Sequence, residues 1–193
     1  MFKDTILQRL IKKYPKPHFE DRSEFFMREL IKSVISQQLL VKASDTIFSR
    51  FVALFSNGKF PTATTILGMN DEEMRHAGLS YAKVTYVKSI ANAFMSDLID
   101  IGKMRKQSDE EVIAELTQIK GIGKWTAEMI LIFTLNRPDV FSIGDLGLRR
   151  AIENLYGITD NHEMIKLSET WRPYRSTACW YLWRSLENKN KSV

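Results

Sequence analysis

An aspartate that stands where a helix is expected to begin is the residue of this chain best suited to chemistry. Asp145 lies in F-S-I-G-D-L-G-L-R-R, residues 141–150, and Pro138 and Gly144 keep its approach out of a helix. A carboxylate at a helix N-terminus is kept ionised by the helix dipole and by backbone N–H groups. Close to a sugar C1′, such a charge could stabilise an oxocarbenium-like transition state or orient an attacking water. The simpler interpretation is a helix N-cap, and the two roles are compatible.

A glycine turn precedes this aspartate, in L-T-Q-I-K-G-I-G-K-W-T at residues 116–126. An amphipathic run at 110–119 leads into the turn and an almost wholly apolar run at 124–135 follows it, so the pattern predicts helix, tight turn, helix. Gly121 and Gly123 permit positive φ values and leave the backbone open to a ligand. The first N–H groups of the second helix favour an anion, so the hairpin could bind a phosphate without reading sequence. An ordinary helical hairpin inside a core is the alternative.

Helices are expected along the rest of the chain, and no convincing strand is found. Apolar spacing and capping residues predict helices at about 23–37, 41–55, a short one from Pro61, 70–78, 80–100, 145–156, 162–170 and 173–187. The expected caps are Asn57-Gly58, Gly157 and the capping boxes Asn70/Glu73 and Ser108/Glu111. The polar residues 188–193 are expected to fray.

Composition limits the classes of function. The chain has 193 residues with 44% hydrophobic content, enough for one globular domain or two small lobes. A net charge of +5 and a pI of about 9.3 permit a polyanionic partner. Lysines and arginines are spread evenly over both halves, so folding must create any surface that faces DNA.

Several cofactors and locations are not expected. Cys179 is the only cysteine, which excludes an internal disulfide and an iron–sulfur cluster. His18, His76 and His162 lack ligand spacing, so no zinc site is expected. The first ten residues do not form a signal peptide, and the apolar run near 125–135 is too short to span a bilayer. The protein is therefore expected to be intracellular, without a membrane partner: cytoplasmic in a prokaryote, nuclear in a eukaryote.

Together these motifs resemble the helix-hairpin-helix (HhH-GPD) superfamily of DNA base-excision glycosylases. The resemblance rests on L-x-x-I-K-G-I-G-x-W-T-A and on the later aspartate in F-x-x-x-D-x-x-L-R. Trp125 and the run W-R-P-Y-R-S-x-A-x-W-Y-L-W, residues 171–183, are similar to the alkylation-repair branch, the type II 3-methyladenine DNA glycosylases. Larger bacterial members have an N-terminal β-rich lobe that has no counterpart here, so a compact form is expected.

The resemblance implies an all-α fold of two helical lobes with a cleft between them. The middle lobe would comprise about residues 36–136, including the hairpin at 116–126. The other lobe would combine about residues 1–35 and 137–193. Asp145 would lie on one wall of the cleft with the hairpin at its mouth, in a protein expected to be a monomer.

The resemblance also implies a reaction and a base pocket. Asp145 matches the family's catalytic aspartate. Trp125 occupies the position where branches that also nick DNA have a lysine for Schiff-base chemistry; a tryptophan cannot form that intermediate, so a monofunctional hydrolase is implied. Trp183 matches a tryptophan of the base pocket, with Trp125 as a second wall and Met129 as a third, where some members have an aromatic residue. Indole faces suit 3-methyladenine and 7-methylguanine because these alkylated purines are cationic.

Damaged duplex DNA is the partner that the resemblance implies. Gln38 and Leu39, in I-S-Q-Q-L-L-V, match the wedge that fills the hole left by an extruded base, although they could be core residues at a helix end. The candidates for phosphate binding are the backbone of Gly121 and Gly123 with Lys124 and Thr126. Arg149, Arg172 and Arg175 are further candidates, but each could equally lie on a solvated helix face or in an ion pair. No cofactor is required. The family often holds Na⁺ or K⁺ in this hairpin through backbone carbonyls, here those of Thr117, Ile119 and Ile122.

Three alternatives stay open. A non-catalytic helix-hairpin-helix protein would bind duplex DNA without preference for damage. A glycosylase for a different lesion would use the same site on another base. A bifunctional glycosylase/lyase would need another amine as its nucleophile.

Overall fold

The computed structural model describes residues 2–55 and 59–187, and these residues form helices without a strand. The chain divides into two compact units. The middle unit is Arg22–Ile130, and the terminal unit is Met1–Asp21 with Leu131–Val193. The middle lobe was expected to span about residues 36–136. The structure begins the middle unit earlier, at Arg22, because residues 26–36 pack on helices of that unit.

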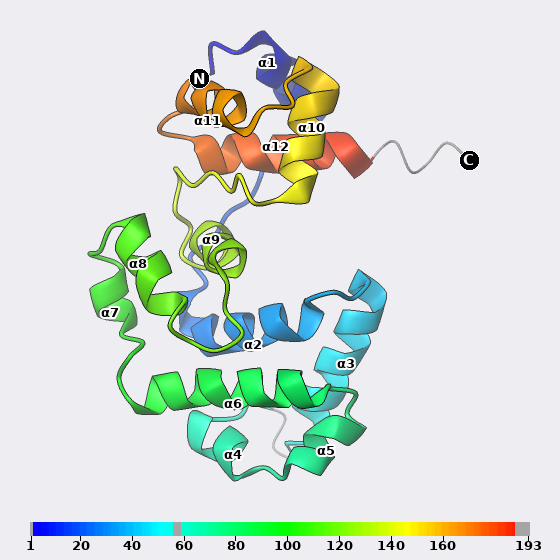
Figure 1. The fold of residues 1–193 in the computed structure, drawn as a ribbon, viewed down its shortest axis with the longest axis vertical. Helices are drawn as coiled ribbons and strands as arrows, with labels where there is room; N and C mark the ends of the chain where they lie inside the picture. Colours follow the sequence, from blue (N-terminus) through cyan, green and yellow to red (C-terminus); the bar gives the residue numbers. More distant parts are fainter. Residues whose placement is uncertain (1, 56–58, 188–193) are drawn as a thin grey trace. The chain divides into compact units, whose positions relative to one another are not determined.

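The middle unit is built around one long helix, α6 (Tyr81–Met95). It contacts α2 (Phe26–Ser36), α4 (Ala63–Gly68) and α5 (Asp71–His76), and α2 also contacts α3 (Val41–Ala53) (Figure 1). The unit also contains η1 (Ser23–Phe25), α7 (Ile101–Met104), α8 (Asp109–Leu116) and the first part of α9 (Lys124–Phe133). Val84, Val87 and Ile90 are buried at helical spacing, so α6 supplies the apolar face on which its neighbours pack.

Side-chain caps account for most of the N-terminal helix ends in this unit. The Ser108/Glu111 capping box at the start of α8 is confirmed. Asn70 also caps its helix, α5, but the capping box expected with Glu73 is not formed, because the Asn70 side chain accepts its hydrogen bond from the Glu72 N–H. The helix predicted at 80–100 is shorter, because Asp97 adopts a φ of 54° and the chain leaves α6 before α7 begins. The predicted Asn57-Gly58 cap and the tail 188–193 lie outside the described residues.

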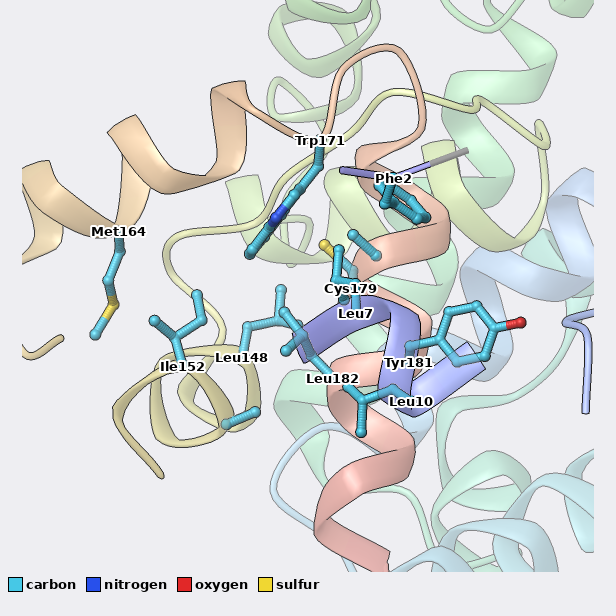
Figure 2. Close-up of a cluster of buried hydrophobic side chains, with 12 residues drawn as sticks. Phe2, Leu7, Leu10, Leu148, Ile152, Met164, Trp171, Cys179, Tyr181 and Leu182 are labelled. Atoms are coloured by element: carbon cyan, nitrogen blue, oxygen red, sulfur yellow. The ribbon is translucent and has the colours of Figure 1, made fainter. Parts of the chain in front are cut away.

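The terminal unit packs around α12 (Arg175–Glu187), which contacts α1 (Thr5–Lys13) and α10 (Leu146–Tyr156). Its other helices are α11 (Asn161–Glu169) and the last part of α9. Figure 2 shows its core, formed by Phe2, Leu7, Leu10, Leu148, Ala151, Ile152, Met164, Trp171, Ala178, Cys179, Tyr181 and Leu182. α1 was not predicted, whereas Gly157 ends α10 in the left-handed conformation, as expected. In the part of the chain described here, no helix has the length and apolar character needed to cross a membrane.

Asp4 ties the start of the chain to this core. Its Oδ1 caps α1 by accepting hydrogen bonds from Ile6 N (2.8 Å) and Leu7 N (3.0 Å). Its Oδ2 accepts hydrogen bonds from the Tyr156 hydroxyl (2.9 Å) and from Nε1 of the fully buried Trp171 (3.0 Å). Burial, with the hydrogen bond to Asp4, raises the pKa of the Tyr156 phenol. One carboxylate therefore satisfies a helix terminus and two aromatic donors at once.

Asp4→Ala is expected to lower the free energy of unfolding by about 3 kcal/mol, because it removes a cap and leaves two partly or fully buried donors unpaired. Asp160→Ala is the matched control, since Asp160 caps α11 through a single exposed bond to the Glu163 N–H; its cost should be about 1 kcal/mol. Urea unfolding of both variants measures the difference. Equal losses would show that Asp4 acts only as a cap.

Candidate functional site

Asp145 lies at the N-cap of α10, as expected, with its side chain held from two directions. Its Oδ1 accepts a hydrogen bond from Leu148 N at 2.7 Å, which caps the helix. The same oxygen accepts a hydrogen bond from Trp183 Nε1, on α12, at 2.9 Å. The structure thus brings together two predicted site residues that are 38 positions apart. A carboxylate oxygen that accepts two hydrogen bonds, one from the first turn of a helix and one from another helix, is held in a fixed orientation.

Gly147 makes this contact possible, and the sequence reasoning missed it. A Cβ atom at Gly147 would lie 3.0 Å from Asp145 Oδ1 and 3.2 Å from Trp183 Cδ1. A side chain at position 147 would therefore press against both the indole and the carboxylate. The available signal was a glycine within the first turn of a predicted helix, where glycine weakens the helix and so needs another reason.

A row of aromatic rings extends from Trp183 within the terminal unit. The Trp183 and Phe133 rings are 5.6 Å apart, and Phe133 lies 6.2 Å from Phe19. Phe133 is 41% exposed although it is large and apolar. Neither phenylalanine was predicted. The signal for Phe133 was its spacing, because it follows Trp125 and Met129 at intervals of four and so shares one side of α9 with them.

The two glycines of the hairpin differ in their roles. Gly121 has a φ of +96°, and a Cβ there would lie 2.3 Å from Cγ of Tyr86, so this position admits only glycine. Gly123 lacks the positive φ expected for it, and a Cβ there would have nothing within 4 Å. Its carbonyl accepts the hydrogen bond from Ala127 N in the first turn of α9. Gly121 is thus required by the fold, whereas Gly123 leaves open space beside the N-terminus of α9.

Lys124 and Thr126, predicted together at the phosphate, differ in exposure. The Lys124 side chain is largely exposed, with its Nζ 3.9 Å from Glu128 Oε1. Thr126 is only 3% exposed, and its hydroxyl lies 3.4 Å from Gln37 Nε2. The expectation for Thr126 is therefore corrected: its side chain faces the interior, because α9 turns this position toward α2. Only its backbone N–H can serve an anion.

Arg172 and Arg175, also expected as phosphate contacts, are engaged in ion pairs. Arg175 Nε donates to Asp139 Oδ1 at 2.9 Å, and its Nη2 donates to the Asp139 carbonyl at 2.7 Å. Arg172 bonds Asp139 and Glu169, and the hydrogen bond with Glu169 raises the Arg172 pKa. Both arginines hold the segment before α10 onto the start of α12. Arg149, the third candidate, is partly buried on α10.

The predicted wedge lies in an exposed loop of the middle unit. Gln38 has a φ of 59°, a conformation that non-glycine residues rarely adopt. Leu39 is 38% exposed, and Leu40 and Val41 are 84% and 77% exposed. The alternative, in which Leu39 and Leu40 are core residues, is therefore wrong. Three consecutive apolar side chains at a strained turn are typical of a binding site.

The carbonyls expected to hold a monovalent cation lie between the C-cap of α8 and the start of α9. Thr117 is the C-cap of α8, and the Ile119 carbonyl accepts a hydrogen bond from Ile122 N at 3.0 Å. Carbonyls at a helix end lack helical partners and keep a lone pair, so this donor set suits Na⁺ or K⁺. Within residues 2–55 and 59–187, no group of three or more His, Cys, Asp or Glu side chains could hold a metal ion. Cys179 is fully buried in the core of the terminal unit, and this burial raises the pKa of its thiol.

A known protein family and individual known proteins are similar to this chain in sequence. The family described as HhH-GPD superfamily base excision DNA repair protein matches residues 31–174. The chain is 43% identical over 183 residues to DNA-3-methyladenine glycosylase 1 of Schizosaccharomyces pombe, covering 93% of this chain and 80% of that protein.

Solved structures of related proteins are also similar to this chain. A 3-methyladenine DNA glycosylase of S. pombe in complex with abasic DNA is similar with a TM-score of 0.85 and 41% identity, over 95% of this chain and 92% of that one. A DNA-3-methyladenine glycosidase of Bacillus halodurans is similar with a TM-score of 0.83 and 32% identity, over 99% and 88%. The predicted all-α glycosylase fold is thereby confirmed, and this chain belongs to the HhH-GPD superfamily of base excision DNA repair proteins.

Proposed function

We propose that this protein is a monofunctional DNA glycosylase that extrudes alkylated purines, of the 3-methyladenine and 7-methylguanine type, from duplex DNA and hydrolyses their N-glycosidic bond. The observation that carries the proposal is the Asp145 carboxylate, fixed by Leu148 N–H and Trp183 Nε1 in a chain of this family. The names of its similar relatives support the same substrate class. The product is an abasic site in base-excision repair.

Asp145 supplies the negative charge that the reaction needs. As the C1′–N bond breaks, its electron pair goes to the base and neutralises the cationic purine, while positive charge develops on the sugar. The carboxylate stabilises that charge, or orients the water whose oxygen bonds to C1′ and whose proton is released. An alkylated purine is already a good leaving group, so a strong general acid is not required.

Trp183 and Phe133 are the proposed contacts to the extruded base in the terminal unit. Trp183 bonds Asp145, the Phe133 ring packs against Trp183, and Phe133 is exposed enough to meet a ligand. A cationic purine gains about 0.5–2 kcal/mol over an electron-rich indole face. Trp125, 43% exposed, and Met129 remain predicted base contacts. Because Trp125 stands where a lyase would have its amine, the enzyme is proposed to lack lyase activity.

The middle unit is proposed to hold the DNA. The backbone at Gly121 and Gly123 and the first N–H groups of α9, with Lys124, bind a phosphate. Gln38 and Leu39 fill the space left by the base. A Na⁺ or K⁺ on the carbonyls of Thr117, Ile119 and Ile122 would add positive charge beside that phosphate.

Base release tests the role of Asp145. Asp145→Asn should lower the single-turnover release of 3-methyladenine from methylated duplex DNA by about 100-fold or more, because a preorganised charge is lost. The free energy of unfolding should change by less than about 0.5 kcal/mol, since asparagine caps a helix as well as aspartate does. Binding of the duplex should persist.

Asp145→Ala separates the cap from the chemistry. It should lose the same activity and in addition about 2 kcal/mol of stability, because the cap is removed and the Trp183 Nε1 donor is left unpaired. If the wild type and both variants bind duplex DNA but release no base, Asp145 is a helix cap alone. The protein is then a DNA-binding module or acts on another lesion, which release assays on other damaged bases would distinguish.

Gly123→Ala tests the phosphate site. The added methyl group meets nothing in the protein but stands beside the first N–H groups of α9, so duplex affinity should fall about 5- to 20-fold while stability is kept. Gly68→Ala is the matched control, because a Cβ there also has nothing within 4 Å, at the end of α4. Fluorescence anisotropy with a labelled duplex measures both. Unchanged affinity of Gly123→Ala would place the phosphate elsewhere.

A further inference from the structure

The loop between α2 and α3 is held in a conformation that its own sequence does not favour. Gln37 ends α2, and Gln38 follows with a φ of 59°. A left-handed residue other than glycine persists only where its surroundings hold it. Leu39 and Leu40 are exposed, so their packing does not supply that hold. Within the loop, Leu39 N donates to the Ser36 carbonyl at 3.1 Å. The restraints from outside the loop act on Gln37 and on the end of α2.

The Gln37 side chain joins this loop to the hairpin. Its Nε2 donates a hydrogen bond to the Gly121 carbonyl at 3.0 Å and lies 3.4 Å from the hydroxyl of Thr126. These two partners lie on either side of Gly123 in the sequence: Gly121 is in the glycine turn, and Thr126 is in the first turn of α9. A single amide therefore bridges the wedge loop to both ends of the proposed phosphate-binding turn.

One face of α6 supports both segments from beneath. Lys83 Nζ donates to the carbonyls of Ile35 (2.7 Å) and Gln37 (3.0 Å), which are terminal carbonyls of α2. Two residues further along that face contact the hairpin. Tyr86 lies under Gly121, and the Ser89 hydroxyl accepts a hydrogen bond from Lys120 N at 3.2 Å.

With the glycosylase function proposed above as its basis, we propose that Gln37 is a positioning residue that fixes the wedge, Gln38 and Leu39, relative to the phosphate-binding hairpin. Base extrusion needs both segments on one duplex at once, the hairpin on a phosphate and the wedge at the lesion. The distance between them must match the DNA, and the Gln37 amide sets it. Lys83 assists by holding the backbone at the end of α2.

The test compares binding to two duplexes of one sequence, one intact and one with a tetrahydrofuran abasic site. The wedge contributes only where a base is missing, whereas the hairpin binds either duplex. Gln37→Met keeps the length of the side chain and removes its donor. It should lower the preference for the abasic duplex about tenfold and leave affinity for the intact duplex within about twofold, as expected for one lost hydrogen bond. Fluorescence of a 2-aminopurine placed beside the abasic site should also be lower in the Gln37→Met complex than in the wild-type complex, because the wedge no longer separates the neighbouring bases.

Gln8→Met is the matched control, since Gln8 Nε2 donates to the Phe2 carbonyl at 2.9 Å in the terminal unit. It should keep the wild-type preference at a similar thermal stability. Lys83→Met should act in the same direction as Gln37→Met, with Lys88→Met, which loses only its bond to Asp71, as its control.

An unchanged preference in Gln37→Met, or an equal loss in Gln8→Met, would overturn the positioning role. A wild type that binds both duplexes equally and releases no base would refute the proposed function, and the inference with it. A wild type that discriminates between them, beside a Gln37→Met variant that also does, refutes the positioning role alone.

Discussion

Two N–H groups, from Leu148 and from the indole of Trp183, meet at one oxygen of Asp145, and the terminal unit must hold α10 and α12 in register for this to occur. The contact between these helices is secured by their shared core and by the absence of a side chain at Gly147. A carboxylate bonded in this way has little freedom to rotate. Its charge is therefore in place before a substrate arrives, which is the condition under which electrostatic stabilisation is most effective.

In the middle unit, a single helix, α6, positions two loops. Lys83, Tyr86 and Ser89 follow one another at intervals of three on α6, so they lie along one face. Tyr86 approaches Gly121 so closely that no side chain fits there, so the turn requires glycine at this position. The strained Gln38 and the exposed leucines after it are stabilised by bonds made elsewhere, as is common where a local cost serves binding.

Local patterns predicted local features well. The Ser108/Glu111 capping box, the N-cap at Asp145 and the left-handed Gly157 each depend on a few neighbouring residues, and all three are present. Features that depend on distant partners were missed or misjudged. Thr126 reads as an exposed residue beside a glycine turn, but it is buried against Gln37, which is 89 positions away. For Arg172 and Arg175 the sequence left phosphate contact and ion pair equally open, and the structure shows that Asp139 binds both.

Spacing within short segments and motifs in fixed order were enough to predict the helical class, the glycine hairpin, the aspartate at a helix start and the family. They could not show that Trp183 bonds Asp145, that Gly121 is required while Gly123 is open, or that Gln37 joins the wedge loop to the hairpin. These depend on side chains far apart in the chain meeting within hydrogen-bond or van der Waals distance. Helical periodicity gives the face on which a residue lies, but the packing of helices determines which residue lies opposite.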